Sequence, residues 1–143
     1  MDFFRIGLIG AGSIGTRHIK AIDEVEHIEL VAVADPSPAA GKVGDARNIE
    51  VFSDAERMLS KTDVEAVIIA TPTERHHADL MTALKYRKTV LVEKPITATM
   101  KEADEVTRFA GSRNVRCLLA IRGDTIHVRV WRGTSSRVAA SAG

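Results

Sequence analysis

Residues 4–22 read FRIGLIGAGSIGTRHIKAI, and this stretch decides the fold. Its first part is mostly apolar, which predicts a short buried strand, and the glycines that follow predict a tight turn. A helix is predicted directly after the turn, because positions about one helical turn apart are occupied by Ile14, His18, Ile19 and Ile22. A strand, a glycine turn and a helix in this order bring free backbone N–H groups to the positive end of the helix dipole. The stretch therefore predicts a site for phosphate groups.

The three glycines of the turn have different expected roles. Gly10 permits the tight turn, Gly12 lets a phosphate approach the backbone, and Gly15 lets the helix pack closely on the strand. The phosphates are expected to bind the N–H groups near Ser13 and Ile14. The simpler interpretation is that the glycines only shape a turn.

The alternation of strands and helices continues along the chain. Buried strands are predicted at residues 28–34, 49–52, 64–70, 89–92 and 115–120. Helices are predicted from an N-cap at Ser53 and over residues 76–86 and 99–110, the last with a stripe of Met100, Ala103, Val106 and Phe109. This order predicts an α/β fold with a doubly wound parallel sheet of the Rossmann type, in three α/β/α layers.

The end of the second predicted strand carries a carboxylate at the spacing that a dinucleotide site requires. Asp35 follows Gly15 by 20 residues, where it could accept hydrogen bonds from the hydroxyls of an adenosine ribose. Its charge would repel a phosphate on that ribose, so NAD is favoured as the cofactor, although Ser37 leaves NADP open. Two alternatives remain: Asp35 only caps the strand end, or the ligand is another adenosine cofactor such as S-adenosylmethionine.

Two later strands end in residues that could act on a ligand. Ligands of doubly wound sheets bind beyond the carboxyl ends of the strands. Thr71-Pro72 follows the fourth predicted strand, and Glu93-Lys94-Pro95 follows the fifth. Lys94 could hydrogen-bond a substrate hydroxyl and favour the alkoxide that forms as hydride leaves. From residue type alone, a solvated loop charge is the more ordinary role for this lysine.

Three motifs together resemble the Gfo/Idh/MocA oxidoreductases (glucose-fructose oxidoreductase, inositol dehydrogenase and rhizopine catabolism proteins). They are GLIGAGSIGTRHIKAI at residues 7–22, ATP-T-x-x-H at 70–76 and VLVEKPI at 90–96. The similarity runs from about Phe4 to Leu119. It implies an N-terminal NAD(P)-binding domain and hydride transfer between NAD(P) and a sugar, cyclitol or related polyol. In typical members a second α/β domain with an open antiparallel sheet follows, and this chain is expected to lack it.

The resemblance also assigns roles to individual residues. Lys94 corresponds to the catalytic lysine near the nicotinamide and the substrate hydroxyl. Thr71, Pro72 and Glu93 would line the cofactor cleft, and His76 matches the family's histidine after the Thr-Pro turn. His77 is expected to be a solvated helix residue, and a packing role for His18 is at least as plausible as a role at the site.

One position departs from the family pattern. Where the family has glycine before the fifth strand, this chain reads Tyr86-Arg87-Lys88. If that residue ends the helix with a positive φ, Arg87 is strained there.

Composition narrows the class of protein further. The 143 residues have a net charge of +1, with 45% hydrophobic and 27% charged side chains, which is ordinary for one globular domain and excludes a collagen, a rod or a strongly basic nucleic-acid binder. The single cysteine, Cys117, excludes an internal disulfide and a Cys-rich zinc site, and agrees with a cytoplasmic protein. No metal site, signal peptide, membrane span, membrane partner or nucleic-acid partner is expected.

The net charge hides a difference between two regions. Residues 1–119 sum to −2, whereas residues 120–143 contain four arginines, no lysine and one acidic residue, and sum to +3. A strand is conceivable at 125–131, but the stretches from Gly133 and from Ala139 look unstructured. The sequence therefore predicts a cofactor-binding domain over 1–119 and a different, disordered tail over 120–143.

A one-base frameshift near codon 119 is one explanation of this tail. The family continues with a motif such as Gly-His-Gln-Arg-Arg-Tyr-Asn-Pro, and codons can be chosen for Ala120–His127 that spell this motif in another frame. The alternative is a genuine short protein whose basic tail binds a partner or RNA. Four arginines without interleaved aromatic residues are a poor nucleic-acid signal.

Two functions follow from these observations. One is the dinucleotide-binding part of a polyol or sugar oxidoreductase. The other is a catalytically inactive cofactor-binding fragment or pseudogene product without a substrate domain. An exposed apolar surface would then favour self-association.

Overall fold

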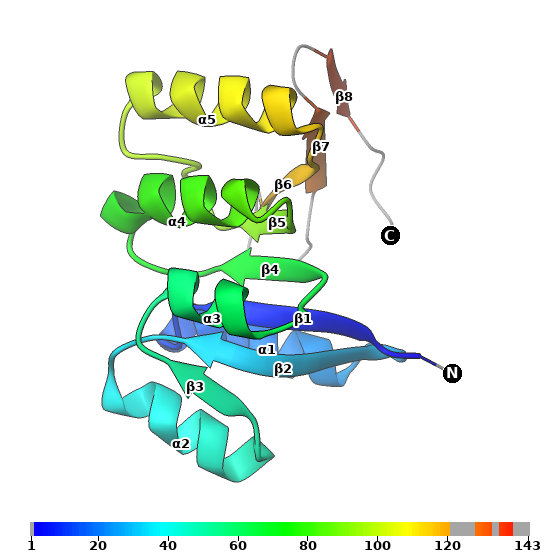
Figure 1. The fold of residues 1–143 in the computed structure, drawn as a ribbon, viewed down its shortest axis with the longest axis vertical. Coiled ribbons are helices and arrows are strands. Elements are labelled where there is room, and N and C mark those ends of the chain that lie inside the picture. Colours follow the sequence, from blue (N-terminus) through cyan, green and yellow to red (C-terminus); the bar gives the residue numbers. More distant parts are fainter. Residues whose placement is uncertain (1, 121–127, 133–134, 139–143) are drawn as a thin grey trace. The chain divides into compact units, whose positions relative to one another are not determined.

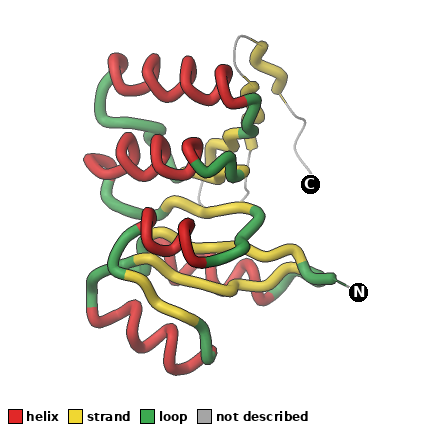
Figure 2. The backbone as a smooth tube through the Cα atoms, in the orientation of Figure 1, coloured by secondary structure: helices red, strands yellow, loops and turns green. Residues whose placement is uncertain are grey.

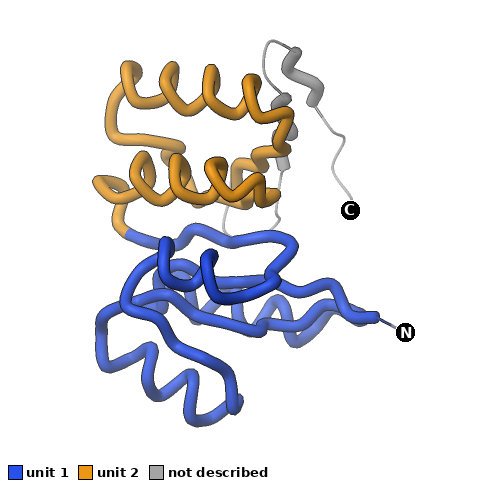
Figure 3. Tube along the Cα trace, viewed as in Figure 1, with its two compact units in different colours: residues 1–71 blue, residues 72–143 orange. Residues whose placement is uncertain are grey.

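The computed structural model describes residues 2–120, 128–132 and 135–138. The chain forms two compact units, Met1–Thr71 and Pro72–Gly143 (Figure 3). Unit 1 contains β1 (Phe4–Ile9), α1 (Ser13–Asp23), β2 (Ile28–Ala34), α2 (Pro38–Arg47), β3 (Glu50–Phe52), α3 (Ala55–Lys61) and β4 (Ala66–Ile69). Unit 2 contains α4 (Thr73–Lys85), β5 (Thr89–Val92), α5 (Met100–Arg113), β6 (Cys117–Ala120), β7 (Val128–Arg132) and β8 (Ser135–Val138).

The strands of unit 1 form a parallel sheet in the order β3-β2-β1-β4. In Figure 1, α1 lies behind this sheet and α3 lies in front of it, so helices cover both faces. Burial on both faces explains why β2 reads IELVAVA with hardly a polar side chain. Leu8, Val33 and Val67 are fully buried in the centre of the unit. The predicted α/β class and its layered arrangement are confirmed.

The strands of unit 2 change direction along the sheet. β5 and β6 are parallel, with Val90 opposite Cys117. β6 and β7 are antiparallel, with Cys117 opposite Trp131, and β7 and β8 are antiparallel as well. Helices α4 and α5 pack against each other beside these strands (Figures 1 and 2).

Several element boundaries differ from those predicted. Helix α2 was not predicted at all, because Asp35-Pro36-Ser37-Pro38 indicates a break, although Pro38 occupies the first turn of the helix. Helix α4 begins at Thr73 instead of His76. The N-cap of α3 is Asp54 instead of Ser53, since the Asp54 carboxylate accepts a 2.8 Å hydrogen bond from the backbone N–H of Arg57.

Two further expectations are wrong in part. Met100 does not belong to the buried face of α5, because it is the first residue of that helix and is 78% exposed. The strand conceived at 125–131 is observed as Val128–Arg132, and Ser135–Val138 form a strand although the stretch from Gly133 was expected to be unstructured. Residues 121–127, 133–134 and 139–143 lie outside the described residues.

After the end of α4, Arg87 adopts a left-handed backbone conformation, which is uncommon for a residue with a side chain. Arg87 has a φ of 55°, in the left-handed region, and its N–H donates to the carbonyl of Leu84 at 3.0 Å. Its guanidinium donates a 3.0 Å hydrogen bond to the carbonyl of Arg113. The strain expected from the sequence is therefore present, and one exposed hydrogen bond offsets part of it.

We expect Arg87→Gly to be more stable than Arg87→Ala by about 1 kcal/mol, because only glycine relieves the left-handed strain. Both variants lose the guanidinium bond to Arg113, so their difference isolates the backbone effect. Urea unfolding of the two variants measures it. Equal midpoints would show that residue 87 adopts another backbone conformation in solution.

Candidate dinucleotide site

The glycine turn lies between β1 and α1, where the sequence places it. Gly10 has a φ of 96°, and a β-carbon there would lie 2.7 Å from the carbonyl carbon and oxygen of Ala70. The position therefore requires glycine for two reasons, its backbone conformation and the close approach of the residue after β4. The N–H of Gly10 donates to the carbonyl of Ala34 at 3.0 Å, which ties the turn to the end of β2.

Gly12 and Gly15 have opposite surroundings. A β-carbon on Gly15 would overlap with the carbonyl oxygen of Gly10, so this glycine lets α1 start directly against the turn. Gly12 is the N-cap of α1, with an ordinary φ of −74°. Among the described residues, no heavy atom lies within 4 Å of a β-carbon built at Gly12. Gly12 therefore faces open space at the start of the helix.

The first turn of α1 is suited to an anion. Within the described part of the chain this turn has no acidic side chain of its own and no side-chain cap, so no side chain of the helix competes with an anion for its free N–H groups. Ile14, in this turn, is 45% exposed. Thr16, which the sequence did not single out, bonds the carbonyl of Gly12 through its hydroxyl at 3.0 Å.

Asp35 is joined to the glycine turn. One oxygen of its carboxylate accepts a 2.7 Å hydrogen bond from the N–H of Ala11, and the other accepts a 2.7 Å bond from the N–H of Ser37. The carboxylate thus holds the turn and the start of α2 in place, in addition to any role toward a ligand. The structure brings Asp35 and the glycines together as expected.

In unit 2, His76 is bound to the loop that carries Lys94. Lys94 is exposed and follows the buried end of β5, while Glu93 is half-buried. His76 is only 1% exposed, and its Nδ1–H donates a 2.7 Å hydrogen bond to the carbonyl oxygen of Pro95. The Lys94–Pro95 peptide bond is cis. His76 thereby positions the Glu93–Pro95 loop, and the assignment of His76 to a cofactor cleft stays a prediction.

We expect His76→Leu to lower the free energy of unfolding by about 1 kcal/mol, because the Pro95 carbonyl loses the hydrogen bond from the buried His76 ring. His76→Asn is the matched variant, since its amide nitrogen can donate from about the same place. Urea unfolding should therefore rank the wild type first, His76→Asn second and His76→Leu last. Equal losses in the two variants would mean that side-chain volume, and not the hydrogen bond, stabilises the loop.

The remaining histidines considered above and the single cysteine are bonded or buried within the fold. His77 was expected to be solvated, but its Nε2 lies 2.8 Å from a carboxylate oxygen of Glu105, which links α4 to α5. His18 is 8% exposed and belongs to the buried side of α1. Burial raises the pKa of the Cys117 thiol to about 12, so this thiol stays protonated and is not a nucleophile at neutral pH.

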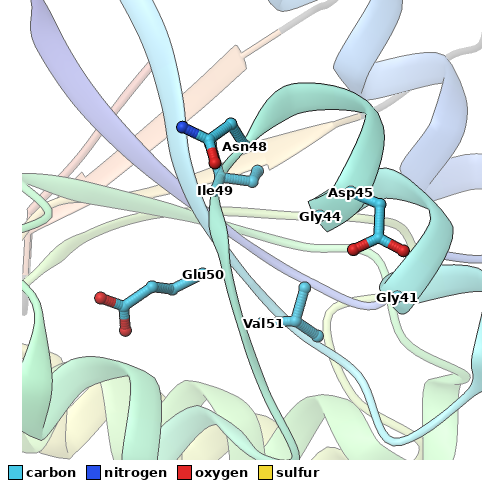
Figure 4. Close-up of a pocket in the computed structure, with 7 residues that line it drawn as sticks. All are labelled: Gly41, Gly44, Asp45, Asn48, Ile49, Glu50 and Val51. Atoms are coloured by element: carbon cyan, nitrogen blue, oxygen red, sulfur yellow. The ribbon is translucent and has the colours of Figure 1, made fainter.

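A separate hollow of about 490 Å³ lies in unit 1, at the end of α2 and the start of β3. Figure 4 shows its two acidic side chains, Asp45 and Glu50, pointing away from each other, so they do not form a joint cation site. More generally, no group of three potential metal ligands is gathered among the described residues. No helix of the described ranges has the length and apolar character to cross a membrane.

Comparison with known proteins identifies this arrangement. A family model described as "Oxidoreductase family, NAD-binding Rossmann fold" (GFO_IDH_MocA) matches residues 4–121. The solved structure of scyllo-inositol dehydrogenase from Lactobacillus casei, with bound NAD(H) and scyllo-inositol, superposes with a TM-score of 0.77 at 27% identity, over 82% of this chain and 36% of its own. The fold and the glycine turn thus define an NAD-binding Rossmann domain.

Two curated relatives agree with that assignment. The rhizopine catabolism protein MocA of Rhizobium meliloti is 38% identical over 111 residues, which are 77% of this chain and 35% of the relative. The inositol 2-dehydrogenase of Rubrobacter xylanophilus is 33% identical over an alignment of 136 residues, which covers 92% of this chain and 39% of the relative. The chain belongs to the Gfo/Idh/MocA family of oxidoreductases, and it spans little more than a third of the length of these relatives.

Proposed function

We propose that this chain binds NAD at the turn before α1 and serves hydride transfer between NAD and a sugar, cyclitol or related polyol. The observation that carries the proposal is the open space at Gly12, at an uncapped helix N-terminus whose turn is bonded to Asp35. The pyrophosphate would bind the N–H groups of Ser13 and Ile14. The two hydroxyls of the adenosine ribose would bind Asp35, whose charge disfavours the phosphate of NADP.

Lys94 is the proposed catalytic residue. NAD, when bound, supplies the acceptor for the hydride. The ammonium group of Lys94 would donate a hydrogen bond to the reacting hydroxyl and stabilise the negative charge that develops on its oxygen. Thr71, Pro72, His76 and Glu93 are proposed to line or support the same cofactor cleft. The names of the relatives, a rhizopine catabolism protein and an inositol dehydrogenase, support polyols as the substrate class.

Calorimetric titration of the 143-residue chain with NAD, NADP and S-adenosylmethionine tests the cofactor. NAD should bind measurably, NADP about tenfold more weakly because of the charge of Asp35, and S-adenosylmethionine not at all. Binding of S-adenosylmethionine in place of NAD would overturn the proposal. Asp35→Asn keeps a hydrogen-bond acceptor but removes the negative charge. It should therefore reduce the difference in affinity between NAD and NADP.

The second candidate function is cofactor binding without turnover. It is favoured by the coverage of the relatives, because this chain matches 35% of one and 39% of the other. A substrate must be held and shielded from water for hydride transfer. We therefore expect the purified chain to bind NAD but to form no NADH with myo-inositol. Steady formation of NADH would show that the 143 residues suffice for the reaction.

We further propose that the cofactor-binding domain ends near residue 119 and that residues 120–143 are a tail of different origin. The family model ends at residue 121, but the Rubrobacter relative aligns over 92% of the chain and so extends into the tail. The nucleotide sequence around codon 119 tests the frameshift: another frame must encode the family motif after Leu119. A cytoplasmic location is proposed from the single, buried, unpaired Cys117.

We also propose self-association through apolar side chains at the amino ends of β1 and β2. Phe3, Phe4 and Val25 are 50%, 43% and 50% exposed there. Analytical ultracentrifugation should show a weak dimer in the wild type. The variant Phe3→Ser should have a smaller fraction of dimer at the same protein concentration. A monomer at all concentrations would contradict this surface.

A further inference from the structure

A second hollow, of about 390 Å³, lies in unit 2 and has a basic lining. It is formed by Arg87, Thr89, Arg113, Asn114, Val115 and Arg116. These residues follow α4 and α5 and lead into β5 and β6, so the hollow lies at the amino ends of these two strands. Lys94 follows the carboxyl end of β5, which separates the hollow from the catalytic position proposed above.

Two matching helix ends create the hollow. Helix α4 closes with Arg87 at φ 55°, and α5 closes with Asn114 at φ 52°. After each left-handed residue the next N–H bonds back to the helix, from Lys88 to Ala83 at 3.0 Å and from Val115 to Ala110 at 3.3 Å. The chain then enters β5 and β6, which are neighbours in the sheet. The two turns therefore lie side by side.

Three arginines line this hollow. Arg87 donates to the carbonyl of Arg113 at 3.0 Å, and the guanidinium of Arg113 lies 5.0 Å from the centre of the Phe109 ring. No carboxylate lines the hollow among the described residues, and in that part of the chain no salt bridge is found for any of the three arginines. Cations at helix C-termini offset the helix dipole, which accounts for Arg87 and Arg113. It does not account for Arg116, which lies beyond α5 and directly before β6.

We propose that this hollow binds the phosphate group of a small phosphorylated molecule. Arginine presents a planar pair of N–H donors that match two phosphate oxygens, and several such groups without acidic partners attract a dianion. Thr89 and Asn114 add a hydroxyl and an amide to the lining. The volume of about 390 Å³ is within the range of small-molecule sites, about 300–1,000 Å³. None of the residues that line the hollow is among those proposed to bind NAD or to act in the reaction.

Titration of the full chain with inorganic pyrophosphate, followed by amide NMR, tests this proposal. We expect saturable shifts at Thr89, Asn114 and Val115, which are distinguishable from shifts at residues 12–15 that would report the glycine turn. Arg116→Gln should weaken binding at the first set by about tenfold, the loss expected for one charged hydrogen-bonding group. The side chain of Arg116 is exposed, so the fold should be unaffected, and a thermal melt checks this.

Arg108→Gln is the matched control, because Arg108 is also exposed and lies on α5 but does not line the hollow. It should leave the affinity for pyrophosphate unchanged. If Arg108→Gln loses as much affinity for pyrophosphate as Arg116→Gln, binding depends only on the overall positive charge of the surface, and the proposal is wrong. Absence of saturable shifts at Thr89, Asn114 and Val115 would overturn it as well. Citrate tests the choice of anion: if it binds as tightly as pyrophosphate, the assignment to phosphate is wrong.

Discussion

Gly15→Ala is expected to lower the free energy of unfolding by about 3 kcal/mol, although alanine favours helices by about 1 kcal/mol over glycine. Gly15 lies in the first turn of α1, and its missing β-carbon would overlap with the carbonyl oxygen of Gly10. That oxygen has little freedom to move, because Gly10 is bonded to Ala34 and packs against Ala70. The added methyl group must therefore push α1 away from β1.

Urea unfolding measures this loss, and Gly41→Ala is its control. Gly41 lies inside α2, and no described heavy atom lies within 4 Å of a β-carbon placed on it. The same substitution should there raise the stability by up to about 1 kcal/mol. If Gly15→Ala lowers the free energy of unfolding and Gly41→Ala raises it, the contact with Gly10 is what makes alanine unfavourable at position 15. A stable Gly15→Ala variant would mean that α1 starts farther from the turn than the structure shows.

Gly12→Ala is expected to weaken NAD binding by at least about tenfold while the protein stays folded. Gly12 has an ordinary backbone conformation and open space around its missing β-carbon, so alanine meets no steric obstacle in the free protein. The loss of glycine at this N-cap costs only about 0.5 kcal/mol of stability. The added methyl group occupies the space that the pyrophosphate needs when it approaches the backbone.

Calorimetry with NAD measures this effect, and Gly41→Ala should bind NAD like the wild type. The combination of an unchanged fold and a lost affinity distinguishes a ligand-contacting glycine from one that only shapes the turn. If Gly12→Ala binds NAD normally, the pyrophosphate does not lie at this helix N-terminus. If Gly12→Ala unfolds instead, the open space at Gly12 is not present in solution.

Much of unit 1 could be predicted from the sequence because its signals are local. The apolar period of β1, the glycines at 10, 12 and 15, and the spacing to Asp35 each reflect a constraint that acts within a few residues or one β-α-β unit. The boundaries were less predictable. Pro38 can stop a helix or begin one, and only the observed helix α2 shows that it is the first residue of a helix here.

Other facts depend on residues that are distant in the sequence. His76 and Pro95 are joined by a hydrogen bond across 19 positions, and His77 and Glu105 across 28. A histidine that is free to be solvated and one that bonds a distant carbonyl look alike in the sequence. Arg116 likewise gives no signal until the ends of α4 and α5 lie side by side.

By itself, the sequence determined the α/β class, the glycine turn and the acidic residue that follows β2, because these depend on backbone conformation and short spacings. The tertiary structure alone decided which glycine is barred from carrying a side chain by contact and which one faces open space. It also decided that Asp35 holds the turn through Ala11, that His76 holds the Lys94 loop through Pro95, and that three arginines line one hollow. The physical reason is that contacts, burial and open space arise only when the packed chain brings distant backbone and side-chain atoms within a few ångströms of each other.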